Sequence, residues 1–238
     1  MSRLYLMRHG QAGPRFNYDA LSDLGRTQSR LLGEYLAGQK LVFAAIYSGA
    51  LSRQQETACQ VREVYWRAGL AAPEVVVDPR WNEFDLGGVY QDLAPVLSAE
   101  DPEFERDYKE MTRAMPDQGA AVHRSTTRCD VAVIRAWVEG RHPHAGESWP
   151  AFRERVTECL QTLAEYRSGE TVAVFTSATP IAVWVGLALG LADGKLLRLA
   201  GVSYNSGITT LRMHQRELTL FGFNSIPHLP DPCWRSFR

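Results

Sequence analysis

The chain alternates short apolar runs with longer segments in which apolar residues recur at helical spacing. Short buried strands are predicted at residues 4–7, 43–47, 74–77 and 171–175. A three-residue connection separates two later apolar runs, at 207–213 and 217–223, and this spacing predicts a hairpin. Helical stripes are predicted at residues 22–38, 51–65, 148–163 and 181–191. This order of strands and helices indicates an α/β protein.

Residues 89–138 depart from the alternating pattern. A weakly apolar, charged helix is predicted at 99–113, and a stretch that contains Pro, Gly, Ser and Thr follows at 116–127. We interpret 89–138 as a largely helical insertion, a lid over the carboxyl edge of the sheet within a single domain covering 1–238.

The most apolar part of the chain, residues 172–192, has about the length of a membrane span. Polar residues and a proline divide it into a strand and a helix of about a dozen residues. Thr179 and Pro180 are predicted to be the cap and the first-turn proline of that helix. A strand, a turn and a helix are therefore expected here, with no membrane segment.

Composition sets further limits on function. The 238 residues are 45% hydrophobic and 22% charged, with a net charge of -1, as is usual for a globular protein. That charge gives no reason to expect a nucleic acid or an anionic membrane as partner. The four cysteines lack the spacing of a zinc site, so no metal is expected. The N-terminal apolar run is too short for a signal peptide, which predicts a cytoplasmic location.

Candidate chemistry lies where the predicted strands end. Arg8 and His9 follow the first strand directly, and open α/β sheets bind ligands at the carboxyl ends of their strands. A neutral imidazole can act as a nucleophile, and an arginine fork suits an oxyanion such as phosphate. Arg53 lies in the first turn of a helix, where its charge opposes the helix dipole unless an anion lies nearby.

A carboxylate follows the third strand, at Glu83, with Asp85 as a rival for the same role. His9, two arginines and this carboxyl acid together form the set that phosphoryl transfer requires. The nucleophile attacks in line, the cations bind the equatorial oxygens, and the acid protonates the leaving group.

Several short motifs occur in a fixed order along the chain. Arg8-His9-Gly10 is followed by residues 48–58, which read Ser-Gly-Ala-Leu-Ser-Arg-Gln-Gln-Glu-Thr-Ala. Further blocks lie at 22–28, 83–87, 146–148 and 224–229. These motifs resemble those of the histidine phosphatase superfamily, the phosphoglycerate-mutase-like clan. The family's second block is usually written Ser-Ser-Pro-Leu-x-Arg-Ala-x-Gln-Thr-Ala.

The resemblance implies a three-layer α/β/α fold with a mostly parallel, doubly wound sheet. It also implies that His9 becomes phosphorylated while Arg8 and Arg53 hold the phosphoryl oxygens, with neither metal nor cofactor. Glu83 would protonate the leaving oxygen and later accept a proton from water. The remaining predicted phosphate-binding positions are Gln11, Asn17, Ser177 and Ala178.

One departure from the family concerns the turn after the strand at 171–175. Members usually carry a second histidine there, in a Ser-His-Gly-Gly turn, but this chain places Ser177 at that position. A serine donates one hydrogen bond and carries no charge. Losing a cationic contact would cost about 2–4 kcal/mol of transition-state stabilisation unless another group replaces it. The candidates are the amides of Ala178 and Thr179, and the side chains of His123, His142, His144, His214 and His228.

Three functions therefore stay open. The first is a phosphatase acting on a small phosphorylated compound or a phosphoprotein. The second is a phosphate-ligand binding protein of the same fold with impaired catalysis, and the third is a phosphoglycerate mutase, whose phosphoenzyme must outlive reorientation of the intermediate. The sequence leaves the oligomeric state open, with a dimer among the options.

Overall fold

A computed structural model describes residues 1–13, 19–114 and 120–237, and within it the side chains of 114 and 120–125 are not described. The chain divides into two compact units. The core unit comprises Met1–Glu83 and Arg155–Arg238, and the helical unit comprises Phe84–Glu154.

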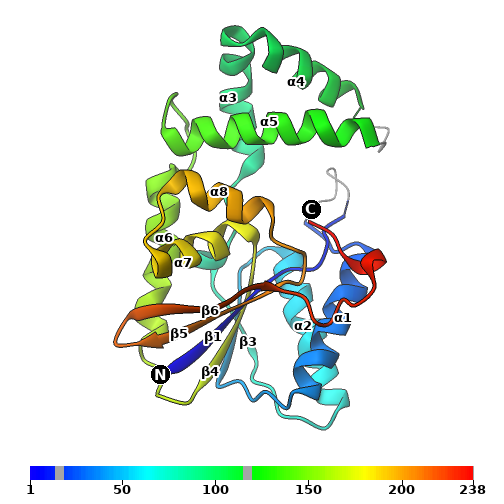
Figure 1. The fold of residues 1–238 in the computed structure, drawn as a ribbon, viewed down its shortest axis with the longest axis vertical. Helices are drawn as coiled ribbons and strands as arrows, with labels where there is room; N and C mark the ends of the chain where they lie inside the picture. The colour runs from blue at the N-terminus through cyan, green and yellow to red at the C-terminus, as the bar shows by residue number, and fades with distance from the viewer. Residues whose placement is uncertain (14–18, 115–119, 238) are drawn as a thin grey trace. The chain divides into compact units, whose positions relative to one another are not determined.

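A six-stranded sheet forms the centre of the core unit, with strand order β3-β2-β4-β1-β5-β6 (Figure 1). Its strands are β1 (Ser2–Arg8), β2 (Ala45–Ser48), β3 (Val75–Val77), β4 (Thr171–Thr176), β5 (Ile208–His214) and β6 (Glu217–Ser225). Neighbours among the first four in spatial order are parallel, whereas β5 pairs antiparallel with both β1 and β6. The prediction of a mostly parallel sheet is confirmed.

Helices cover both faces of this sheet, as Figure 1 shows. One face carries α1 (Asp23–Gly38) and α2 (Ser52–Arg67), and the other carries α7 (Ala178–Leu189). Met7 and Phe175 point from the sheet into the apolar core that α1 and α2 cover, where Leu32 and Val61 are also buried. Because side chains alternate along a strand, β4, which is buried throughout, and β1, which is buried over most of its length, supply apolar residues to both faces. The predicted α/β/α layering follows from this burial.

The helix after β4 begins earlier than predicted. Ser177 is the N-cap of α7, so Thr179 and Pro180 are its second and third residues. A proline is tolerated throughout the first turn, because those backbone N–H groups have no partner within the helix. Gly190, in the left-handed conformation with φ 65°, ends the helix. No helix in the described part of the chain is both long and apolar enough to cross a membrane.

The hairpin between β5 and β6 is tighter than predicted. His214 still pairs with Glu217, so only Gln215 and Arg216 form the turn. Both have positive φ, 49° and 71°, as a two-residue type I′ turn requires. A short helix that the sequence analysis missed, α8 (Asp193–Gly201), lies between α7 and β5.

The helical unit contains α3 (Leu86–Glu100), α4 (Pro102–Ala114), α5 (Ala120–Glu139) and the start of α6 (Trp149–Leu163). The predicted helix at 99–113 is wrong at its start, because Asp101 is extended and its carboxylate caps α4 by accepting from the Glu103 N–H. Within the stretch at 116–127, the chain is helical from 120 onward, as expected for a largely helical insertion. Stacked aromatic rings fill the interior of the helical unit. The ring centroids of Phe84 and Trp137, for example, are 4.5 Å apart. That the insertion at 89–138 acts as a lid stays a prediction.

Candidate active site

The parallel register brings the carboxyl ends of β1, β2 and β4 together. Arg8 pairs with Thr176, and Ser48 pairs with Phe175. Beyond the strands, the His9 N–H donates to the Thr176 carbonyl at 2.9 Å, and the Gly49 N–H donates to the Phe175 carbonyl at 3.1 Å. His9, Gly49 and Ser177 therefore follow three adjacent strands at one edge of the sheet.

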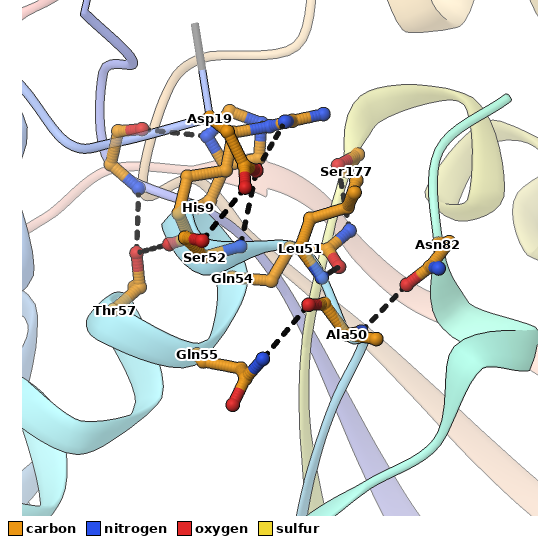
Figure 2. Close-up of polar contacts among 12 residues, drawn as sticks. His9, Asp19, Ala50, Leu51, Ser52, Gln54, Gln55, Thr57, Asn82 and Ser177 are labelled. Carbon is orange, nitrogen blue, oxygen red and sulfur yellow. Dashed lines mark hydrogen bonds and ion pairs between the residues drawn. The ribbon is translucent and has the colours of Figure 1, made fainter. Parts of the chain in front are cut away.

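His9 is buried, and the partners of its two ring nitrogens fix its tautomer (Figure 2). Nδ1 lies 2.6 Å from the Gly10 carbonyl oxygen, which only accepts, so the ring proton is on Nδ1. The Arg53 Nε–H donates to Nε2 at 3.2 Å. Burial, then the charge of Arg53 and that of Arg8, hold the pKa of His9 well below 6.5. His9 is therefore neutral at neutral pH, with its lone pair on Nε2, as a nucleophile requires.

The backbone on the C-terminal side of His9 is held by α1 and α2. The Gly10 N–H donates to Thr57 Oγ1 at 3.1 Å, and Thr57 Oγ1 in turn donates to the Arg53 carbonyl at 2.7 Å. A Cβ on Gly10 would lie 2.3 Å from the Gly25 carbonyl oxygen. Glycine is required at position 10 because the backbone of α1 comes this close.

A second support acts on the His9 carbonyl, which accepts from the Ser206 N–H at 3.1 Å and from Asn205 Nδ2 at 3.4 Å. Ser206 has a φ of 55°, which is uncommon for a residue other than glycine. Its hydroxyl is hydrogen-bonded to His228 Nε2, 2.8 Å away. Burial lowers the pKa of His228 to about 4, so this histidine is neutral at neutral pH.

Arg53 belongs to a group of donors at the N-terminus of α2. In Figure 2 these donors converge on the carboxylate of Asp19. Arg53 Nη1 donates to Asp19 Oδ1 at 3.2 Å, and Ser52 donates to the same carboxylate through its N–H at 3.1 Å and its hydroxyl at 2.7 Å. A guanidinium, a hydroxyl and a helix N-terminus together form an oxyanion site beside His9.

Arg8 is buried and has different partners. Its Nη1 donates to the Ser203 carbonyl and, at 3.0 Å, to the carbonyl of Phe237 near the C-terminus. The same C-terminal segment accepts from Gln28 Nε2 through the Trp234 carbonyl at 2.7 Å. The phosphate-binding role of Arg8 stays a prediction, but its charge contributes to the lowered pKa of His9.

The two rival carboxylates lie in different units. Glu83 Oε2 accepts from the Thr179 N–H at 3.2 Å, so this carboxylate lies at the N-terminus of α7. Asp85 belongs to the helical unit, where it is the N-cap residue of α3 and its carboxylate lies over Gly88. The structure therefore ties Glu83 to the helix that Ser177 begins. It also assigns the Thr179 amide, a candidate replacement for the second histidine, to Glu83.

Ser177 contacts a side chain that the sequence analysis did not consider. Gln54 Nε2 donates to Ser177 Oγ at 2.8 Å and to the Trp81 carbonyl at 3.2 Å. The sequence did carry a signal for a polar contact at Gln54. Position 54 is alanine in the usual family motif, and a buried glutamine at that site requires polar partners.

The other predicted phosphate-binding residues are described in part. Gln11 Oε1 accepts from the Ser22 hydroxyl at 2.9 Å, at the start of α1. Ala178 is the first residue of α7 and is buried. Asn17 lies outside the described residues.

The remaining histidines have other positions. His228 is bonded to Ser206, and His214 ends β5 beside the amino end of β1, because Ser2 pairs with Met213. In the helical unit, His142 lies 3.2 Å from Glu100 and His144 lies 2.7 Å from Asp92. The side chain of His123 lies outside the described part. Over the side chains that are described, no cluster of three or more His, Cys, Asp or Glu could hold a metal ion.

Family comparison agrees with this geometry. The sequence model of the histidine phosphatase superfamily (branch 1) matches residues 4–139 and 130–226. The chain belongs to the histidine phosphatase superfamily. The resemblance inferred from the motifs is thereby confirmed.

Individual relatives cover nearly the whole chain. A metal-independent phosphoserine phosphatase of Arabidopsis thaliana is 22% identical over 240 residues, which are 96% of this chain and 84% of that protein. The solved structure of YhfR from Bacillus stearothermophilus is 20% identical, covers 96% of this chain and 100% of its own, and has a TM-score of 0.67. A mycobacterial glucosyl-3-phosphoglycerate phosphatase in complex with VO3 is 24% identical over 94% of this chain and 99% of its own, with a TM-score of 0.60. The two solved structures share the fold, and the family and relatives indicate a phosphatase, a hydrolase of phosphate esters.

Proposed function

We propose that the protein hydrolyses a phosphomonoester without a metal ion, through a phosphohistidine formed at His9. The observation that carries the proposal is the state of His9, which is neutral, with the lone pair of Nε2 facing the guanidinium of Arg53. A site that only bound phosphate would gain nothing from a neutral imidazole in that place, because a cation binds phosphate better.

In the first half-reaction, His9 Nε2 forms a bond to phosphorus and the bond from phosphorus to the ester oxygen breaks. Glu83 gives its proton to that oxygen, which leaves as an alcohol. The donors that now hold Asp19 bind the phosphoryl oxygens, so the substrate displaces one anion with another. In the second half, Glu83 takes a proton from water, whose oxygen attacks phosphorus and releases His9 and inorganic phosphate.

The substrate class is proposed more broadly than the reaction. The oxyanion site recognises the phosphoryl group itself and therefore admits a small phosphorylated compound or a phosphorylated protein side chain. The relative named a metal-independent phosphoserine phosphatase supports a metal-free reaction. A cytoplasmic location fits such substrates.

A phosphate-binding protein with impaired turnover is the second candidate. The neutral Ser177 favours it, because Ser177 supplies no positive charge at the edge of the site. It predicts binding of inorganic phosphate without hydrolysis.

Hydrolysis of p-nitrophenyl phosphate in the presence of EDTA tests the proposal. Wild-type protein should show turnover, and His9→Ala should lose it, because no nucleophile remains. His214→Ala, at the exposed hairpin, is the matched control and should keep the wild-type rate. Equal rates in wild type and His9→Ala would refute a phosphohistidine mechanism, and complete loss of activity with EDTA would refute the metal-free reaction.

A further inference from the structure

Gln54 is fully buried, and three hydrogen bonds fix the orientation of its amide (Figure 2). The Leu51 N–H can only donate, and it lies 3.4 Å from Oε1. The Trp81 carbonyl can only accept, and it lies 3.2 Å from Nε2. The oxygen must therefore face Leu51 and the nitrogen must face Trp81. One hydrogen of Nε2 remains, and it is donated to Ser177 Oγ at 2.8 Å.

This orientation decides what the Ser177 hydroxyl can do. Ser177 Oγ accepts from Gln54, so its own hydrogen points away from Gln54 Nε2 and can be donated to a different acceptor. Ser177 directly follows Thr176, whose carbonyl accepts the His9 N–H. Gln54 directly follows Arg53, which contacts His9 Nε2. The pair thus connects the two chain segments that flank His9.

Two neighbouring positions also depart from the family motif, and the first of them accommodates Gln54. Position 49 is glycine where the motif has serine, and a Cβ at Gly49 would lie 1.9 Å from Gln54 Oε1. Position 50 is alanine where the motif has proline, and the Ala50 N–H donates to Asn82 Oδ1 at 2.6 Å, which a proline could not do. Asn82 Oδ1 would in turn lie 2.9 Å from the same Cβ on Gly49. Gln54 and Ser177 therefore form a polar cluster, and the glycine at position 49 leaves room for it.

We propose that Gln54 is a positioning residue of the phosphatase site, which directs the Ser177 hydroxyl hydrogen to a phosphoryl oxygen on His9. The Ser177 hydroxyl then supplies one oriented neutral donor at the position where the family usually has a second histidine. This inference rests on the proposed function, because it requires a phosphoryl group on His9. Gln54 contacts no reacting atom and acts through Ser177.

A double-mutant cycle tests the proposal, with Gln54→Met, Ser177→Ala and the two combined. Loss of an oriented donor to a transferring group lowers kcat by about 100-fold, which we expect for Ser177→Ala. Gln54→Met, which retains volume but donates nothing, should lower kcat by roughly 10-fold and leave KM nearly unchanged. In the Ser177→Ala background, Gln54→Met should change kcat by less than about threefold, because the hydroxyl that it positions is gone.

The neighbouring glutamine provides a matched control. Gln55 lies in the same turn of α2 and donates to the Ala50 carbonyl at 2.8 Å. Gln55→Met should leave kcat unchanged. If Gln54→Met fails to fold, Gln54→Asn replaces it in the cycle, because that amide is one methylene too short to reach Ser177.

Two results would overturn the proposal. One is an equal loss of kcat when Gln54→Met is introduced into wild type and into Ser177→Ala, as a purely structural role of Gln54 predicts. The other is unchanged kcat in Ser177→Ala. Binding of inorganic phosphate, measured by calorimetry on the same four proteins, separates this failure from failure of the proposed function. If wild type shows no hydrolysis, the phosphatase reaction is refuted. In that case, the same coupling measured in phosphate affinity would still support the orientation of the Ser177 hydroxyl by Gln54. Additive losses of phosphate affinity would refute that orientation.

Discussion

Protonation of His228 should destabilise the folded protein in mild acid. This histidine is buried under Ser206, and burial lowers its pKa from 6.5 to about 4. The perturbation is a change from about pH 7.5 to about pH 5.0, compared between wild type and His228→Gln, which has no titrating group at this position.

The sign follows from proton binding. Between pH 6.5 and about 4 the unfolded chain binds a proton at position 228 and the folded protein does not. The free energy of unfolding therefore keeps this contribution above pH 6.5 and loses it as the pH falls toward 4. At about pH 5.0 the loss amounts to about 2 kcal/mol, and it approaches about 3 kcal/mol below the folded pKa. His9, whose pKa is also lowered, adds a loss of the same sign in both proteins.

Urea unfolding at several pH values measures this contribution. The difference in unfolding free energy between about pH 7.5 and about pH 5.0 should be about 2 kcal/mol smaller in His228→Gln than in wild type. His214→Gln, at an exposed histidine of the hairpin, is the matched control substitution. Identical slopes in wild type and His228→Gln would refute the assignment of His228 as a buried neutral group.

Two further predictions concern the anion site and the Ser177 cluster. Asp19→Asn should tighten binding of inorganic phosphate by about two- to fivefold, as expected for removing one exposed competing carboxylate from Arg53, and weaker binding in calorimetry would contradict the competition. Ser177→His alone should overpack against Gln54 and cost about 1–3 kcal/mol of stability together with activity, whereas combination with Gln54→Ala should restore both. Equal thermal stability and equal kcat in Ser177→His and in the combined variant would contradict the prediction that a histidine at position 177 overpacks against Gln54.

The elements that the sequence predicted best are those whose pattern reflects local burial. The apolar runs at 4–7 and 171–175 became β1 and β4 because both strands are buried on both faces. The start of α7 was misplaced, because a proline is compatible with any residue of a helix's first turn and so does not mark the first one. The predicted helix at 99–113 was likewise wrong at its start. Periodicity alone indicated a continuous helix, whereas the carboxylate of Asp101 caps a new helix there.

The site could be predicted only as far as each residue follows a strand or begins a helix. His9, Arg53 and Glu83 were predicted in this way, since strand ends gather at one edge of a parallel sheet. Gln54 was missed because its role depends on Ser177, which lies 123 positions away in sequence. The contact of Arg8 with the carbonyl of Phe237 was missed for a similar reason, because a backbone acceptor leaves no mark in the sequence.

Detection of the phosphoenzyme is the direct test of phosphoryl transfer to His9. Protein mixed with excess p-nitrophenyl phosphate and quenched in alkali, where phosphohistidine survives, can be analysed by 31P NMR and peptide mass spectrometry. We expect one phosphoryl group on Nε2 of His9, absent from His9→Ala and released as inorganic phosphate on further incubation. Continued hydrolysis with no phosphoryl group on His9, or with the group on another residue, would contradict it.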